Sequence, residues 1–454
     1  MPGPSSPLSL AALTQSVESG QIDTVLVVFT DMQGRLQGKR IHARYFLDEV
    51  AGHGMEGCNY LLAVDVEMNT VSGYEISSWE QGYGDFLITP DLGTLRLAPW
   101  LPSSAMVQCD LSWLDGTPVR QSPRQVLRAQ VDEAQRLGFT PYGATELEFI
   151  VFRDSYQQAA DANYQGLTGS TRYNVDYSIL GTSGDEPLMR DIRNAMYGAG
   201  LTVESSKGEC NLGQHEIAFR YDEVLRTADN HVVFKVAAKE LADRHGNALT
   251  FMAKYDEREG NSCHIHLSLR GTDGGLVFWD EETNARTPLY DQFVAGLLAT
   301  ARDFTLLYAP NVNSYKRFAD ASFAPTSVAW GIDNRTCSIR LVGSGKSARL
   351  ENRIPGGDVN PYLALAAMIA GGLHGIEQEL DPVPETEGNA YTSGADRVPR
   401  TLAEARAAFA ESKVARSCLG DAVVDHYTNM ADVELRAFEA AVTDWELRRG
   451  FERL

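Results

Sequence analysis

A strand-like run, Thr145-Glu146-Leu147-Glu148-Phe149-Ile150-Val151-Phe152, organises this chain. It carries two acids where apolar side chains are expected. Residues two apart on a strand point to the same face, so Glu146 and Glu148 share one surface while Leu147 and Phe149 share the other. A buried pair of carboxylates needs either a retained proton or a neutralising cation. The alternative is a solvated strand face, and the rest of the sequence has to decide between the two.

Composition limits the classes of protein to which the chain can belong. Its 454 residues, 43% hydrophobic and 22% charged, are enough for two domains with sizeable cores. A net charge of -21 argues against nucleic acid or an anionic membrane as a partner, because both require a basic surface. Six cysteines without C-x-x-C spacing favour reduced thiols and a cytoplasmic protein. The first basic residue is Arg35, so no secretory signal is expected.

Periodicity and turn residues predict an α+β protein in two parts. Residues 1–18 are rich in Pro and Ser and then weakly helical, and they are predicted to be a loosely held lead-in. The β-branched run 24–30 is predicted to form a hairpin with 35–40. Glycine and proline punctuation then predicts a small β-rich domain, 1–112, ahead of a second domain, 113–454. In the second domain we expect helices at 123–137, 186–200 and 222–246, and strands at 201–219, 248–254, 263–269, 328–333, 337–342 and 348–354.

Two further features concern the C-terminal third. The longest uncharged run, 359–376, is interrupted by Pro361 and two glycines and is shorter than the roughly 20 apolar residues of a membrane span, so it predicts a buried helix. Thr401 and Glu404 have the spacing of a capping box.

Three more segments place polar side chains on strand faces or beside them. His264, His266 and Ser268 alternate with apolar residues and share one face. Glu209 and Glu216 bracket a glycine-containing turn. Arg349, Glu351 and Arg353 alternate in the same way, and Arg317, Arg335 and Arg340 lie upstream of them. Each segment has an ordinary alternative: structural histidines, a solvated loop and a surface ion-pair ladder, respectively.

Taken together, these segments predict metal-assisted phosphoryl transfer. Five carboxylates with one or two imidazoles, and no sulfur ligand, suit Mg²⁺ or Mn²⁺, and five acids are enough for two such ions. Arginines beside acidic sites are what a polyphosphate and a carboxylate substrate need. The segment 343–347, Gly-Ser-Gly-Lys-Ser, imitates the end of a phosphate-binding loop, but no helix is expected after it.

The ordered segments resemble the glutamine synthetase family over essentially the whole chain. They are Glu146-Leu147-Glu148, Gly213-Gln214-His215-Glu216, His264-Ile265-His266, 313–317, Asn334-Arg335 with Arg340, 349–353 and Asn360-Pro361-Tyr362. The resemblance implies the glutamine synthetase fold, with an N-terminal β-grasp domain and a C-terminal catalytic domain. It also implies a homo-oligomer, a dodecamer of two stacked hexamers in which neighbouring subunits share each active site. Within the family the chain is most similar to actinobacterial γ-glutamylethanolamide synthetases, and next to γ-glutamylpolyamine synthetases.

The resemblance also implies a role for each matching residue. One metal site would consist of Glu148, Glu209 and Glu216, and the other of Glu146, His264 and Glu351. Glutamate would lie against Gly260, Arg317 and Arg353, while Arg335 and Arg340 would meet the ATP phosphates and the transferred phosphoryl group. The nucleotide side would include Tyr221, His266, Ser268, Lys346 and Arg349. In the family, glutamate attacks ATP and an amine then displaces phosphate from the acyl phosphate.

Two departures from the family pattern lie where glutamine synthetases bind ammonium, and a third lies beside the predicted glutamate contacts. Glu56, in Met55-Glu56-Gly57-Cys58-Asn59, stands where glutamine synthetases carry an aspartate, and Phe323 stands where their flap carries a glutamate. Glu259 replaces the usual asparagine before Gly260. No adenylylation-type segment surrounds Tyr391, so that regulation is not predicted.

These departures predict a small organic primary amine as acceptor, with ethanolamine preferred. Such an amine needs one acid for its head, here Glu56, and apolar space for its arm, here provided by Phe323. Simple packing of the flap is the alternative role for Phe323. A γ-glutamylpolyamine synthetase, a true glutamine synthetase and a non-catalytic scaffold of this fold are the alternative functions.

Overall fold

The computed structural model describes residues 8–454, and its first sheet is built from residues 24–112. Strand β1 (Thr24–Thr30) pairs antiparallel with β2 (Leu36–His42) and parallel with β6 (Ser104–Ser112). The sheet order is β2-β1-β6-β4-β3, with β3 at Met55–Cys58 and β4 at Asp85–Pro90, and β5 (Arg96–Leu97) pairs with β6. The predicted hairpin is therefore confirmed. A hairpin whose first strand pairs in parallel with a later strand is the arrangement expected of a β-grasp sheet.

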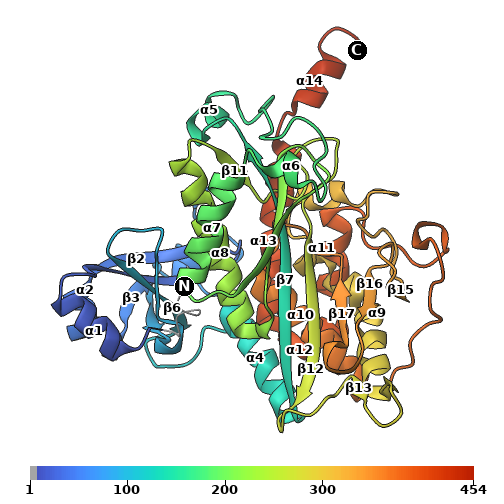
Figure 1. The fold of residues 1–454 in the computed structure, drawn as a ribbon, viewed down its shortest axis with the longest axis horizontal. Coiled ribbons are helices and arrows are strands. Elements are labelled where there is room, and N and C mark those ends of the chain that lie inside the picture. Colours follow the sequence, from blue (N-terminus) through green and yellow to red (C-terminus); the bar gives the residue numbers. More distant parts are fainter. Residues whose placement is uncertain (1–7) are drawn as a thin grey trace.

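Short helices accompany this sheet, which lies to one side of the molecule (Figure 1). Helix α1 (Leu10–Glu18) is capped by Ser9, which confirms the helical character predicted for this segment. It buries Leu13 and Val17 in the core, so the prediction that the lead-in is loosely held is wrong for the described part, 8–18. Between β2 and β3 lie α2 (Ala43–Tyr45), a π-helical turn (Phe46–Val50) and α3 (Ala51–His53).

The second sheet has nine strands and is centred on β7 (Phe139–Phe152). Its order is β15-β16-β17-β12-β7-β9-β8, and two short strands, β10 and β11, also pair with β7. The other bounds are β8 (Val203–Gly208), β9 (Gln214–Phe219), β10 (Asp222–Glu223), β11 (Ala248–Thr250), β12 (Cys263–Gly271), β15 (Trp330–Ile332), β16 (Ile339–Val342) and β17 (Arg349–Asn352). A small separate ribbon pairs β13 (Trp279–Asp280) with β14 (Ala285–Arg286). The predicted strands at 248–254 and 328–333 are thus shorter than expected.

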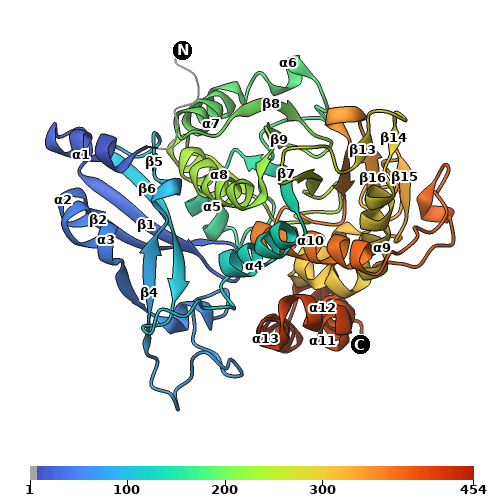
Figure 2. The ribbon, with the colours of Figure 1, turned by 90° about the horizontal axis from the view of Figure 1, so that it is seen from below.

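Helices cover this sheet, and α10 lies at their centre (Figure 2). Helix α10 (Pro361–Glu377) packs against α4 (Pro123–Arg136), α8 (Val224–Arg244) and α9 (Pro288–Tyr308). A Cβ on Gly372 would lie 2.1 Å from the Phe293 ring, so the glycine allows α9 and α10 to approach closely. The uncharged run is therefore a buried helix, as predicted. No helix within 8–454 is long and apolar enough to cross a membrane.

The remaining helices lie between β7 and β8 and after α10. Before β8 come α5 (Tyr156–Asp161), α6 (Ile179–Thr182) and α7 (Glu186–Gly198). The C-terminal series is α11 (Leu402–Glu411), α12 (Lys413–Leu419), α13 (Asp421–Ala440) and α14 (Asp444–Gly450). Thr401 caps α11 by accepting the Glu404 N–H at 3.1 Å, but the Glu404 carboxylate accepts from Arg400, so only half of the capping box forms.

Buried ion pairs join the first sheet to the helices of the second part. Arg124 on α4 donates to Asp110 of β6 at 2.6 Å, to Asp91 at 2.8 Å and to Asp229 of α8 at 3.0 Å. Removing one partner of such a network would leave an uncompensated buried charge. The division into domains 1–112 and 113–454 remains a prediction.

Candidate active site

The register of five strands brings the predicted site residues onto one face of the second sheet. Glu146 on β7 lies opposite His264 on β12, and Glu148 lies opposite Glu216 on β9. Glu351 on β17 lies opposite His266 on one side and Arg340 of β16 on the other. Because strand side chains alternate with period two, these pairings place all the polar residues on the same face.

The first carboxylate cluster consists of Glu148, Glu209 and Glu216. Each offers an oxygen, and these oxygens all lie within 4.8 Å of one another. Glu148 is fixed from behind: its Oε2 accepts the Ser262 N–H at 2.7 Å and lies 3.2 Å from the side-chain nitrogen of Gln214.

Glu216 of this cluster has a raised pKa. Burial raises its pKa to about 8, and the negative charges of Glu146, Glu148 and Glu351 add to the increase. Those charges come from both predicted metal sites, so the two sites share one electrostatic environment. A cation bound between the carboxylates would relieve this repulsion.

Lys207 supplies a positive charge at this cluster. Its ammonium contacts Glu209, lies 3.9 Å from Glu216, and lies 4.8 Å from the centre of the Tyr177 ring. Lys207 was not among the residues predicted from sequence. Its position two residues before Glu209 is the signal that could have identified it, because such residues share a strand face.

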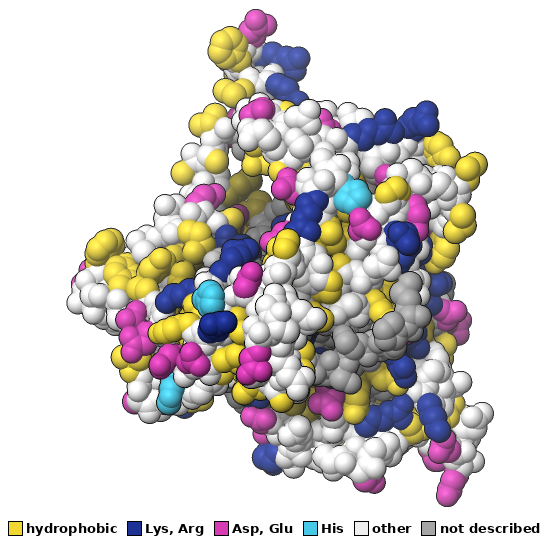
Figure 3. Space-filling view, turned by 60° about the vertical axis from the view of Figure 1, so that its left-hand side comes forward, with side chains coloured by type: hydrophobic (Ala, Val, Ile, Leu, Met, Phe, Trp, Pro, Cys, Tyr) yellow, Lys and Arg dark blue, Asp and Glu magenta, His cyan; other side chains and the backbone are white. Residues whose placement is uncertain are grey.

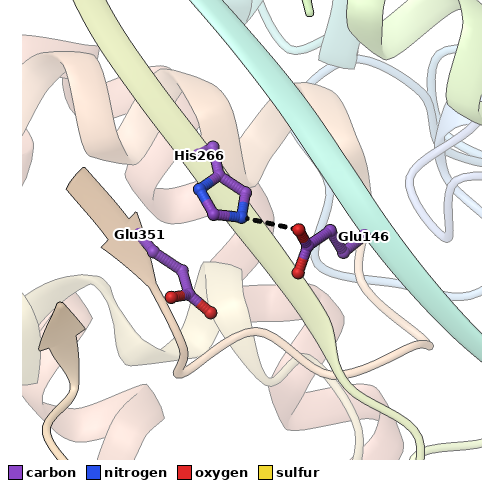
Figure 4. Close-up of side chains that lie close together, drawn as sticks. All are labelled: Glu146, His266 and Glu351. Carbon is purple, nitrogen blue, oxygen red and sulfur yellow. Dashed lines mark ion pairs between the residues drawn. The ribbon is translucent and has the colours of Figure 1, made fainter. Parts of the chain in front are cut away.

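The second cluster consists of Glu146, Glu351 and two imidazoles. Figure 4 shows Glu146, His266 and Glu351 facing one another from β7, β12 and β17. His266 Nε2 lies 3.0 Å from Glu146, whereas His264 Nδ1 lies 3.4 Å from Glu351 and 3.7 Å from Glu146. Both histidines are therefore near enough to join the carboxylates. The assignment of His264 to metal and His266 to nucleotide remains a prediction.

Both acids of the second cluster are held in the charged form. Burial opposes ionisation of Glu351, but its interactions with His264 and with the positive charge of Arg353, together with the hydrogen bond from Arg340, lower its pKa to about 2. Burial opposes ionisation of Glu146 as well, and the contacts of His264 and His266 outweigh it, so this pKa is also lowered. The pKa of His264 is lowered by burial and by the charge of Arg353, which favours the neutral imidazole that metals bind.

Three arginines surround the clusters. Arg340 donates to Glu351 at 2.8 Å, and Arg353 contacts the other oxygen of the same carboxylate. Arg317 is 2% exposed and donates to Ser262 and to the carbonyls of Arg353 and Ile354. Within residues 8–454, no carboxylate lies within 4.0 Å of its guanidinium. The charges of Glu148 and Asp358 act on Arg317 from farther away, and a buried cation without a carboxylate in direct contact is suited to a carboxylate ligand.

Gly260 lies directly against Arg317. A Cβ at this position would be 2.2 Å from the Ala253 carbonyl and 3.0 Å from the Arg317 Cγ. Glycine is therefore required for this close approach, and the backbone at Gly260 lies beside the predicted glutamate-binding arginine.

The predicted nucleotide residues line two adjoining cavities. Tyr221, His266, Ser268, Lys346 and Arg349 all line a cavity of about 390 Å³. A larger cavity of about 860 Å³ is lined by Arg335 and Arg340, and the two cavities share Glu146, His266 and Arg349. The segment 345–347 forms only a 3₁₀ turn before β17, so it is not a phosphate-binding loop followed by a helix.

Glu56 is the predicted residue that this chain does not bring to the site. It is exposed on β3, the edge strand of the first sheet, opposite Leu87 of β4, and its carbonyl accepts from Lys39. Phe323 is also exposed, at 60%, but its carbonyl lies 3.4 Å from Arg353, so it borders the predicted glutamate site.

The residues present suit divalent metal ions. The first cluster is all oxygen and the second combines two carboxylates with an imidazole, which are the donors that Mg²⁺ and Mn²⁺ prefer. The raised pKa of Glu216 and the buried, unpartnered nitrogen of His264, Nε2, are features that a purely structural network would avoid.

Comparison with known proteins identifies the family. The family model described as glutamine synthetase, catalytic domain, matches residues 120–450. This chain belongs to the glutamine synthetase family. It is 60% identical to the γ-glutamylethanolamide synthetase GlnA4 of Streptomyces coelicolor over 99% of this chain and 96% of that protein. It is 39% identical to a glutamate-isopropylamine ligase of a Pseudomonas species, over 95% and 96% of the two chains.

A solved structure of GmaS in complex with ADP has the same fold. It superimposes with a TM-score of 0.85 at 27% identity, covering 99% of this chain and 100% of the other. Glutamine synthetase family enzymes use ATP and divalent metal ions, so the chemistry predicted from the strand faces agrees with the family. The roles of individual residues remain predictions.

Proposed function

We propose that this protein joins the γ-carboxylate of glutamate to a small organic primary amine, preferably ethanolamine, with ATP as the energy source. The observation that carries the proposal is the single polar strand face with its two carboxylate clusters, beside a loop that carries Phe323 where glutamine synthetases carry an acid. Similarity to the S. coelicolor γ-glutamylethanolamide synthetase over nearly the whole chain supports the choice of amine.

In the first half-reaction, the chain's arginines orient two anionic substrates. Arg317 and Arg353, with the backbone of Gly260, would bind glutamate and aim its γ-carboxylate at ATP. An oxygen of that carboxylate forms a bond to the γ-phosphorus while the bond to the bridging oxygen of ADP breaks. Arg335 and Arg340 would offset the charge of the transferred group.

Two ions, Mg²⁺ or Mn²⁺, would be held by Glu148, Glu209 and Glu216 and by Glu146, His264 and Glu351. Bound there, such ions supply positive charge that neutralises phosphate oxygens. The nucleotide would lie against Tyr221, Ser268, Lys346 and Arg349, which line the cavity beside these clusters.

In the second half-reaction, the amine nitrogen attacks the acyl carbon and phosphate leaves. The ammonium form of the amine must first lose a proton, and we propose Glu56 as its acceptor. Since Glu56 lies on an edge strand away from the clusters of its own chain, a neighbouring subunit would have to supply it. Phe323 would provide the apolar wall for the alkyl arm.

We also propose that the protein is a homo-oligomer, namely the dodecamer that the family resemblance implies. The C-terminal helix α14 projects from the body and carries exposed apolar side chains, as Figures 1 and 3 show. Trp445 is 60% exposed and Phe451 is 85% exposed, which suits burial against another subunit. The domain division 1–112 and 113–454 and a cytoplasmic location also belong to the proposal.

An amine panel tests the function directly. Phosphate release with glutamate and ATP would be measured for ethanolamine, isopropylamine, putrescine and ammonium, and the amide product would be identified by mass spectrometry. We expect ethanolamine to give the highest kcat/KM. If ammonium is used as efficiently as any organic amine, the proposed pocket for an organic amine is wrong. If isopropylamine gives the highest kcat/KM, the pocket selects branched alkyl groups instead.

Variants of Phe323 test the proposed pocket for the amine. Phe323→Glu should shift the preference toward ammonium, whereas the matched control Phe323→Leu, which keeps an apolar wall, should retain ethanolamine use. An unchanged amine preference in Phe323→Glu would leave Phe323 with a packing role alone.

Mixed oligomers test whether the site is shared. Glu56→Ala and Glu148→Ala should each be inactive when pure, because each lacks one half of a site. When the two are unfolded together and reassembled, some sites would combine an intact Glu56 with an intact Glu148, and about a quarter of the activity should return, as random pairing gives. No recovery from correctly assembled mixtures would contradict the shared site.

A further inference from the structure

The segment 318–326, here called the flap, has a strained backbone. Ala321 and Phe323 have φ angles of 65° and 57°, in the left-handed region that bulky side chains rarely adopt. Non-glycine residues persist there only where surrounding contacts fix them. The contacts that fix the flap are therefore part of how the site is built.

Besides backbone bonds such as that from the Val398 N–H to the Thr326 carbonyl at 3.2 Å, three side chains from later in the chain contact the flap. Arg353, the predicted glutamate-binding residue, donates to the Phe323 carbonyl at 3.4 Å. Tyr391 donates its hydroxyl to the next carbonyl, Ala324, at 3.1 Å. Arg397 lies 3.4 Å from the exposed Asp320. The Tyr391 bond is the shortest of the three and ends on the residue beside Phe323.

Tyr391 is itself held in place by the loop that carries Arg335. It lies in a 3₁₀ turn (Ala390–Thr392) capped by Asn389, whose side chain accepts the Tyr391 N–H at 3.0 Å. Thr336 Oγ1 accepts the Ala390 N–H at 2.9 Å, and Asn334 donates to the Gly388 carbonyl at 2.7 Å. The two residues that flank Arg335 are thus bonded to the segment 388–390, which leads into the turn that carries Tyr391.

We propose that Tyr391 is a positioning residue that couples the phosphate side of the active site to the flap on the acceptor side. Hydrogen bonds join the Arg335 loop to the backbone of this turn, and the Tyr391 hydroxyl joins the turn to Ala324. This set of bonds holds Phe323 beside Arg353, where it limits the entry of water while the amine is bound. The inference rests on the proposed function, since it assigns a second-half-reaction role to a residue that does not contact substrate.

Loss of the Tyr391 hydroxyl should leave phosphoryl transfer intact and weaken the coupling of ATP consumption to amide formation. Without the hydroxyl, the flap opens more often and water competes with the amine for the acyl phosphate. Water attack forms a bond to the acyl carbon, phosphate leaves and glutamate is regenerated, so ATP is consumed without amide formation. The phosphate-side residues are unchanged, and the KM values for ATP and glutamate should stay near those of the wild type.

The test compares Tyr391→Phe with the wild type and with a matched control, Tyr45→Phe. Tyr45 is 58% exposed on α2, and the control removes the same atom from a surface position. We expect the KM for the amine to rise about fivefold in Tyr391→Phe, the change that corresponds to one neutral hydrogen bond. The ratio of amide formed to phosphate released should fall, while phosphate release at saturating amine stays within about twofold of wild type.

Hydrogen exchange provides a readout that does not depend on activity. In the oligomeric enzyme with ATP and glutamate omitted, backbone amides of the flap should exchange faster in Tyr391→Phe than in the wild type, and those of β12 should not change. An unchanged flap exchange rate or an unchanged amide-to-phosphate ratio would overturn the coupling role. If instead the wild type forms no amide with any amine, the proposed function fails, which is a separate result.

Discussion

His426 gives a stability prediction whose size follows from its surroundings. It lies on α13, is 4% exposed, and contacts Met32 Sδ at 2.8 Å and the Tyr74 ring at 4.6 Å between centres. Burial lowers its pKa from 6.5 to about 3, although a hydrogen bond to the backbone of Leu62 opposes the decrease. Through this neutral imidazole, helix α13 in the C-terminal part of the chain contacts Met32 and Tyr74 of the N-terminal part.

The sign of the pH effect follows from the lowered pKa. Below pH 6.5 the unfolded chain takes up a proton on this histidine, while the folded chain does not until about pH 3. Stability is therefore fully present above pH 6.5 and is lost as the pH falls toward 3. A single group with these values lowers the free energy of unfolding by about 2 kcal/mol between about pH 7 and about pH 5. Any folded-state pKa below about 4 gives nearly the same loss over this interval.

The assay compares urea unfolding of wild type and His426→Gln at these two pH values, at one protein concentration because the protein is proposed to be an oligomer. The variant should lose about 2 kcal/mol less than the wild type on acidification, whatever its stability at about pH 7. The control, His53→Gln, changes an exposed histidine and should behave like the wild type. Equal losses in wild type and His426→Gln would refute the reasoning.

Four further predictions concern the active site. Glu148→Gln should reduce phosphate release at least about a hundredfold while the protein stays assembled, and near-normal turnover at saturating Mg²⁺ would contradict its role. His264→Ala should weaken Mn²⁺ binding in calorimetry at least about tenfold, while His266→Ala should weaken nucleotide binding more; the reverse result would exchange their roles. Arg335→Ala should lower kcat rather than raise the KM for glutamate, because it meets charge that develops in the transition state, and an effect confined to that KM would count against it. Lys207→Met should tighten Mn²⁺ binding several-fold, since it removes a cation from the carboxylate cluster, and weaker binding would show that the lysine supports the site.

Metal chemistry could be predicted from sequence because alternation on a strand is local. The spacing of Glu146 and Glu148, and of His264 and His266, fixes which side chains share a face before any strand is paired. The buried helix at 361–377 was predictable for a similar reason, since interruption of the run by proline and glycine argued against a membrane span. The prediction that the lead-in is loosely held was wrong because the segment itself shows only weak periodicity. Leu13 and Val17 are buried by residues that lie later in the sequence.

The sequence by itself determined the types of ligand, the polar faces and the family, because these depend on residue identity and short-range periodicity. Only the tertiary structure decided how the faces combine: pairing register sets Glu148 opposite Glu216 and Glu351 opposite His266, and register depends on contacts between strands far apart in the chain. It also placed Lys207 among the carboxylates and left Glu56 on a distant edge strand. The physical reason is that charge repulsion and burial act through space, so the pKa of Glu216 reflects acids from three other strand positions that no local pattern in the sequence connects to it.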